Sequence, residues 1–175
     1  MINNNWSRQY KRMLRWKNYI VELSSNSELD LERLHDYFFS FFNNCNHLGE
    51  WLKEFGFENA INYRNADKYL DICRALSNGD KHFLIDKYKS TYKSKAYRTH
   101  YKQSDFITTT SSTGFFGYYH HDDSRVPIKP SHPLKDGDII IQTDTEIFDA
   151  FLFMDCCIRS WQEYLKKQDI DLELL

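Results

Sequence analysis

The residues best suited to chemistry in this chain lie in one short stretch, Ile72–Phe83. A guanidinium, a carboxamide, an ammonium and an imidazole occur there, supplied by Arg74, Asn78, Lys81 and His82. A helix that continues through Gly79 places Arg74, Asn78 and His82 on successive turns of one stripe, with Lys81 beside them. A helix that ends at Gly79 leaves Lys81 and His82 just beyond its C-terminus. In both arrangements the four groups converge, as a site that binds or cleaves an anionic substrate requires.

The segment that follows, Lys81–Gln103, is strongly basic, with seven Lys or Arg and a single acid, Asp86. In an extended conformation one face carries Lys87, Lys89, Lys93 and Lys95 and the other carries Tyr88 and Tyr92, because side chains alternate along a strand. Amines interleaved with aromatic rings are typical of proteins that bind single-stranded nucleic acid. An edge strand protected by lysines explains the same pattern. If this part of the chain binds RNA, we expect five residues to contact the phosphates. They are Asn78, just before the segment, and Lys81, Lys87, Lys89 and Lys93 within it.

Residue types that bind metals are present but do not form a specific motif. The run His120–Asp123 lies in a proline-containing loop with only His132 nearby, and adjacent loop residues rarely converge on one ion. A metal-dependent hydrolase that uses this run is the weakest alternative. Four cysteines occupy apolar positions of helical patterns and form no C-x-x-C pair, so we expect reduced core residues at Cys45, Cys73, Cys156 and Cys157. The sequence therefore predicts neither a metal nor a cofactor.

Helical periodicity organises most of the chain. Large apolar residues recur at steps of three and four and predict helices over Trp6–Leu23 and Glu28–Phe55, with Gly56 as the stop of the second. A third helix is expected from about Asn65, after an Asn-rich loop, and the stretch around Arg74 closes it. A final helix with Ile147 on its apolar stripe is expected to be capped at Asp144 or Thr145.

The first predicted helix also has a basic face. Its only acid is Glu22, near its end, and its basic residues are Arg8, Lys11, Arg12, Arg15 and Lys17. This face is either solvated or in contact with phosphates.

Strand-forming residues lie between the third and fourth predicted helices. The segment Phe106–Tyr119 and the run Asp138–Gln142 predict a small antiparallel sheet. The expected fold is therefore mainly α: a four-helix bundle with a small antiparallel β insertion, basic and β-rich, at about 83–143. We expect a single domain over residues 1–175, because this length suits one core.

Composition excludes some classes of protein. The formal net charge of −2 argues against a protein that coats nucleic acid. Of the 175 residues, 17% are aromatic, which favours a large aromatic core. No run of 18 apolar residues and no apolar N-terminal segment occurs, so we expect a cytoplasmic protein that does not enter the membrane.

Three signatures resemble a group of small bacterial and phage proteins. They are His47-Leu48-x-x-Trp51-Leu52, the C-R-x-L-x-N-G-x-K-H motif from Cys73 to His82, and Ala150 with Cys156 and Trp161. More distantly, a helical bundle that carries an Arg and a following His late in one long helix is similar to the HEPN superfamily. Its members include metal-independent ribonucleases of toxin–antitoxin, abortive-infection and CRISPR systems.

The resemblance implies a homodimer in which Arg and His from both subunits act on RNA, and the 2′-hydroxyl attacks to give a cyclic phosphate. Arg74 would stabilise the phosphorane, His82 would move a proton, and Asn78 and Lys81 would bind phosphate. An antitoxin or another defence-system protein is the implied protein partner. Seven residues separate Arg74 from His82, where four to six are usual, and Ala75 stands where a polar residue commonly follows the Arg.

Two other interpretations remain open. In one, the chain is a non-catalytic module that binds nucleic acid or protein. In the other, the stretch is structural: Gly79 caps the helix, His82 packs in the core, and Arg74 pairs with Asp71 or Asp80. Under the ribonuclease hypothesis, Arg74→Ala and His82→Ala are expected to change stability by no more than about 1 kcal/mol, as surface substitutions do.

Overall fold

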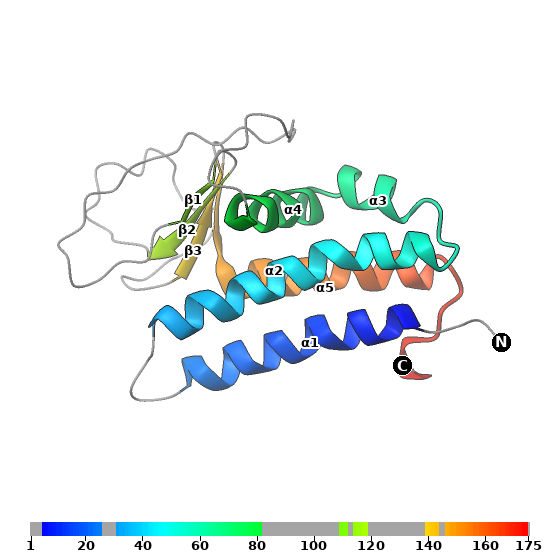
Figure 1. Cartoon of the computed structure of the whole chain (residues 1–175), viewed down its shortest axis with the longest axis horizontal. Coiled ribbons are helices and arrows are strands. Elements are labelled where there is room, and N and C mark those ends of the chain that lie inside the picture. The colour runs from blue at the N-terminus through cyan, green and yellow to red at the C-terminus, as the bar shows by residue number, and fades with distance from the viewer. Residues whose placement is uncertain are drawn as a thin grey trace.

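The computed structural model of the chain describes residues 5–25, 31–81, 109–111, 114–118, 139–143 and 146–174 (Figure 1). Within these segments the chain is mainly helical. The helices are α1 (Asn5–Ser24), α2 (Leu31–Glu54), α3 (Ala60–Ala66), α4 (Lys68–Lys81) and α5 (Ala150–Lys166), followed by the short 3-10 helix η1 (Leu172–Leu174). The strands are β1 (Thr109–Ser111), β2 (Gly114–Tyr118), β3 (Ile139–Gln142) and β4 (Ile147–Asp149). No helix in the described segments is long and apolar enough to cross a membrane.

Helix α2 is the central element of the core. It packs along α1 on one side and against α4 on the other, while α5 lies beside it and contacts α4 (Figure 1). The apolar stripe expected for this helix is buried, and its innermost residues are Leu34, Phe38, Phe41, Cys45, Leu48 and Leu52. Trp6 and Met13 of α1 and Trp161 of α5 complete the same core, with at most 1% of each residue exposed. The helical prediction for α1 and α2 is therefore confirmed.

The β insertion is a four-stranded antiparallel sheet in the order β1-β2-β3-β4. Phe116 pairs with Ile141, and Ile141 pairs in turn with Phe148. The sheet lies at the end of the molecule where α4 ends and α5 begins (Figure 1), and it contacts both helices. The expected antiparallel sheet between α4 and α5 is thus confirmed.

The predicted start of the last helix is wrong. Ile147 belongs to β4, where it pairs with Gln142 and is buried, and α5 begins only at Ala150. The cap is Asp149, whose carboxylate accepts a hydrogen bond from the Leu152 backbone N–H at 2.9 Å. This carboxylate satisfies a free N–H group of the first turn. Ile147 and Phe148, the two apolar residues before Asp149, therefore belong to strand β4 and not to the helix.

The connection between α2 and α4 is more ordered than the sequence predicts. The stop at Gly56 is confirmed, because α2 ends at Glu54 and Gly56 has a φ of +96°, which favours glycine. The Asn-rich segment after it, expected to be a loop, contains the short helix α3. Asp67 then caps the start of α4, since its carboxylate accepts hydrogen bonds from the Tyr69 and Leu70 N–H groups, both at 3.0 Å.

Candidate functional site

Helix α4 carries the described part of the predicted site. It continues through Gly79 and ends at Lys81, so the alternative in which Gly79 ends the helix is wrong. Arg74 and Asn78 therefore lie one turn apart on a continuous helix. The side chain of Lys81 and all of His82 lie outside the described residues, as do the predicted phosphate contacts Lys87, Lys89 and Lys93.

Arg74 is held in an ion pair by an acid on its own helix. Its Nε donates to Asp71 Oδ1 at 3.0 Å, and its Nη2 contacts the same oxygen. The Asp71 side chain is 1% exposed and that of Arg74 is 14% exposed. The pairing with Asp71 that we considered from the sequence is therefore confirmed. Arg74 is not a surface residue, and the expectation that Arg74→Ala barely affects stability must be revised.

A buried polar network fixes the orientation of α4 against α2. Ser77, which is fully buried, donates to Asn43 Oδ1 at 2.7 Å and accepts from Asn46 Nδ2 at 3.2 Å. Arg64 of α3 extends the network, because its Nη1 donates to Asn46 Oδ1 at 3.0 Å. Since Ser77 faces α2, the line through Arg74 and Asn78 lies on the flank of the helix. The sequence signal for this network is the cluster Asn43-Asn44-x-Asn46 within an apolar stripe. We did not predict the network from this cluster.

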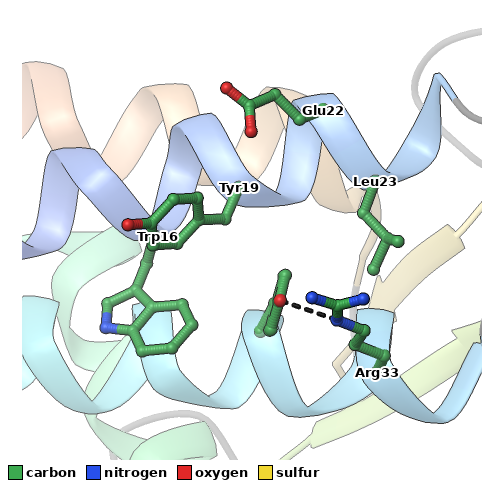
Figure 2. Close-up of a pocket in the computed structure, with 6 residues that line it drawn as sticks. Trp16, Tyr19, Glu22, Leu23 and Arg33 are labelled. Carbon is green, nitrogen blue, oxygen red and sulfur yellow. Dashed lines mark hydrogen bonds between the residues drawn. The ribbon is translucent and has the colours of Figure 1, made fainter.

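A pocket of about 520 Å³ opens between α1 and the start of α2, a part of the chain to which we had assigned no site (Figure 2). It is lined by Trp16, Tyr19, Glu22, Leu23, Arg33 and Tyr37. The Trp16 ring lies 5.2 Å from that of Tyr37 and 5.6 Å from that of Tyr19, measured between centroids. Arg33 Nε donates to the Tyr37 hydroxyl at 2.7 Å. Clustered aromatic rings with a guanidinium beside them suit a planar, electron-rich ligand.

Exposed arginines lead along α1 to this pocket. Arg8, Arg12 and Arg15 are solvent-exposed, and their spacing of four and three residues places them on one line that ends at Tyr19. We call these three residues the arginine line. Lys17, by contrast, is engaged with Asp155 of α5 at 2.5 Å. The basic face predicted for α1 is therefore partly solvated and partly used to hold the last helix.

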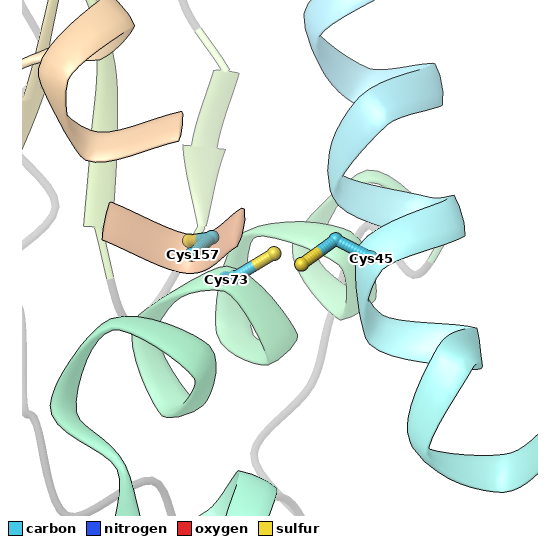
Figure 3. Close-up of side chains that lie close together, drawn as sticks. All are labelled: Cys45, Cys73 and Cys157. Carbon is cyan, nitrogen blue, oxygen red and sulfur yellow. The ribbon is translucent and has the colours of Figure 1, made fainter. Parts of the chain in front are cut away.

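Three of the four cysteines converge in the core, where α2, α4 and α5 meet (Figure 3). The sulfur atoms of Cys45, Cys73 and Cys157 lie within 4.8 Å of one another, and all three residues are fully buried. Cys156 is only half-buried and lies outside the group. Their burial agrees with the sequence, but their convergence was not predicted.

The three thiols differ in acidity. Burial raises the pKa of Cys73 and of Cys157 well above the ordinary value, because a thiolate loses its hydration in the core. Burial opposes ionisation of Cys45 too, but the neighbouring side chains of Cys157, Cys73 and Trp161 outweigh it and lower the pKa of Cys45 to about 5. Among the described residues, this cluster is the group that has the donors to hold a metal ion.

The second run considered for metal binding, His120–Asp123, lies outside the described residues. Comparison with known proteins adds no further assignment: no protein-family model, no curated protein and no solved structure matches this chain.

Proposed function

We propose that this protein is a metal-independent RNA endonuclease of the HEPN type, with Arg74 and His82 as its catalytic residues. The observation that supports this most strongly is the continuity of α4 through Gly79 to Lys81. A helix that continues one residue further carries His82 one turn beyond Asn78 and two turns beyond Arg74. The packing of α1 on α2, α2 on α4 and α4 on α5 supports a helical bundle as the scaffold of this enzyme.

The proposed reaction is an internal transfer at phosphorus. The RNA 2′-hydroxyl attacks the adjacent phosphate, the bond to the 5′-oxygen breaks, and a 2′,3′-cyclic phosphate forms. His82 moves a proton between the hydroxyl and the leaving oxygen, because an ordinary imidazole titrates near neutral pH. Arg74 stabilises the negative charge of the phosphorane. Asn78 and Lys81 bind the phosphate.

The proposed enzyme is a cytoplasmic homodimer that acts on RNA in phage defence or in a toxin–antitoxin system. A twofold axis would bring a second copy of the Arg74 and His82 line to the same RNA backbone. A cognate antitoxin or another defence-system protein would then cover the Arg74 and His82 site in the resting complex.

The direct test is RNA cleavage by the purified protein in EDTA. We expect cleavage to proceed with the metal removed and to leave 2′,3′-cyclic phosphate ends, which mass spectrometry of the fragments identifies. Cleavage that requires a divalent ion, or that leaves 3′-hydroxyl ends, would contradict the proposed mechanism. A protein that binds RNA without cleaving it would support the second candidate.

The second candidate is a non-catalytic module that binds single-stranded nucleic acid. Two observations favour it. The Arg74 charge is already paired with the buried Asp71, which weakens its attraction for a phosphate. The arginine line leads to an aromatic pocket on α1 and α2, a combination that binds phosphates and stacks bases.

Replacing Arg8, Arg12 and Arg15 together with glutamine is expected to weaken RNA binding in a salt-dependent way. Each phosphate contact to a single strand contributes about 0.7 to the slope of log affinity against log salt, so the slope should fall by about 2. Fluorescence anisotropy across a salt series measures it. The matched control replaces the exposed residues Lys53, Arg159 and Lys166 with glutamine and removes the same charge elsewhere. Equal slopes in the two triple variants would exclude the arginine line as the binding surface.

A further inference from the structure

The group formed by Cys45, Cys73 and Cys157 has the geometry of a metal site. Each thiol comes from a different helix, and the sulfurs of Cys45 and Cys73 point toward each other beside Cys157 (Figure 3). With metal–sulfur bonds of about 2.3 Å, the sulfurs of a trigonal site lie roughly 4.0 Å apart. The sulfurs here are within 4.8 Å of one another, so small rotations about the side-chain bonds bring them to bonding distance.

The donor set selects the kind of ion. Thiolates are soft ligands that favour Cu(I) and zinc. Structural zinc sites are almost always four-coordinate, but no His, Asp, Glu or further Cys joins these three thiols within the described segments. All three residues are fully buried, so water does not readily supply a fourth ligand. A closed set of three thiolates suits a monovalent, three-coordinate ion.

The surroundings provide partial charge balance. Three thiolates around one monovalent cation carry two negative charges, which a buried site must compensate. Arg64 is 8% exposed, and its positive charge favours the thiolate of Cys73, while its Nη1 also lies 3.8 Å from a carboxylate oxygen of Glu50. Its guanidinium is held in place by Asn46, through the side-chain oxygen at 3.0 Å and the backbone carbonyl at 3.2 Å. The N–H of Trp161 also fixes the backbone of one ligand, because it donates to the Cys45 carbonyl at 3.1 Å.

We propose that Cys45, Cys73 and Cys157 bind one Cu(I) ion in a buried trigonal site that joins α2, α4 and α5. Binding releases the protons of thiols that are protonated in the free protein, and each sulfur forms one bond to copper. In the free protein Cys73 and Cys157 instead approach the carbonyls of Phe42 and Tyr69, both at 3.6 Å. The oxidation state of copper and sulfur does not change. The site is independent of the proposed ribonuclease activity.

The test is an anaerobic titration of the reduced protein with Cu(I) against a chromophoric Cu(I) chelator. We expect one ion per chain. The variants Cys45→Ser, Cys73→Ser and Cys157→Ser should each lower the affinity more than the ~10–100-fold by which loss of an outer hydrogen-bond partner weakens a metal site. Cys156→Ser is the matched control and should bind as the wild type does, because Cys156 lies outside the group. Circular dichroism of each metal-free variant verifies its fold.

X-ray absorption of the copper-loaded wild type gives a second measurement that needs no variant. Three sulfur neighbours and no nitrogen or oxygen neighbour are expected. The proposal is overturned if the wild type fails to compete with the chelator, or if it takes zinc in preference to copper. Equal loss in Cys156→Ser, or a copper ion with only two sulfur neighbours, overturns it as well.

Discussion

Replacing His82 by alanine is expected to lower the rate of RNA cleavage by about 10²–10⁴-fold, the usual contribution of a general acid or base. The variant should still bind RNA, because Lys81 and the arginine line keep their charges. Single-turnover cleavage of a labelled RNA in EDTA measures the chemical step apart from binding. The wild-type rate should also depend on pH, because a general acid or base acts in only one protonation state, and this dependence should be absent from the variant.

His35 offers a matched control for this experiment. It is a histidine on α2 whose ring lies 4.5 Å from that of Phe39, so its role is in packing. His35→Ala removes the same imidazole and should leave the cleavage rate and its pH dependence unchanged. If His82→Ala cleaves RNA as fast as the wild type, or if both variants lose activity equally, then His82 does not transfer the proton.

The long helices could be predicted because their signal is local. The apolar stripe of α2 extends over many turns, and its inner residues are buried where periodicity placed them: Leu34, Phe38, Phe41, Leu48 and Leu52. The short helix α3 has only seven residues and no such stripe, so its stability comes from packing. The start of α5 was misplaced because Ile147 and Phe148 fit a helical stripe as well as a strand. Only the pairing with β3 decides between the two.

The candidate sites were less predictable because they depend on contacts between distant segments. Asp71 lies three residues before Arg74, a spacing that suggests an ion pair, but its burial follows from how α4 packs on α2. The three cysteines are separated by 28 and 84 residues along the chain and meet only when three helices are assembled. The pocket on α1 needs Arg33 and Tyr37 of the next helix. No single-helix pattern contains this information.

Replacing Arg74 by alanine is expected to lower the free energy of unfolding by about 3–5 kcal/mol, the usual effect of removing one partner from a buried ion pair. The guanidinium neutralises a carboxylate that is 1% exposed, and alanine leaves that charge in the core without it. Urea unfolding followed by circular dichroism measures the change. Arg15→Ala, an exposed arginine of α1, is the control and should change the free energy by less than about 0.5 kcal/mol.

Because of this instability, loss of cleavage in Arg74→Ala alone does not identify a catalytic residue. Arg74→Lys keeps the charge near Asp71 but cannot donate through both Nε and Nη2, so it should be more stable than the alanine variant. If Arg74 stabilises the phosphorane, the folded lysine variant should cleave RNA more slowly at saturating substrate, with little change in RNA affinity. A folded lysine variant with wild-type cleavage would restrict Arg74 to its structural pair with Asp71, and His82 would then need a different electrophilic partner.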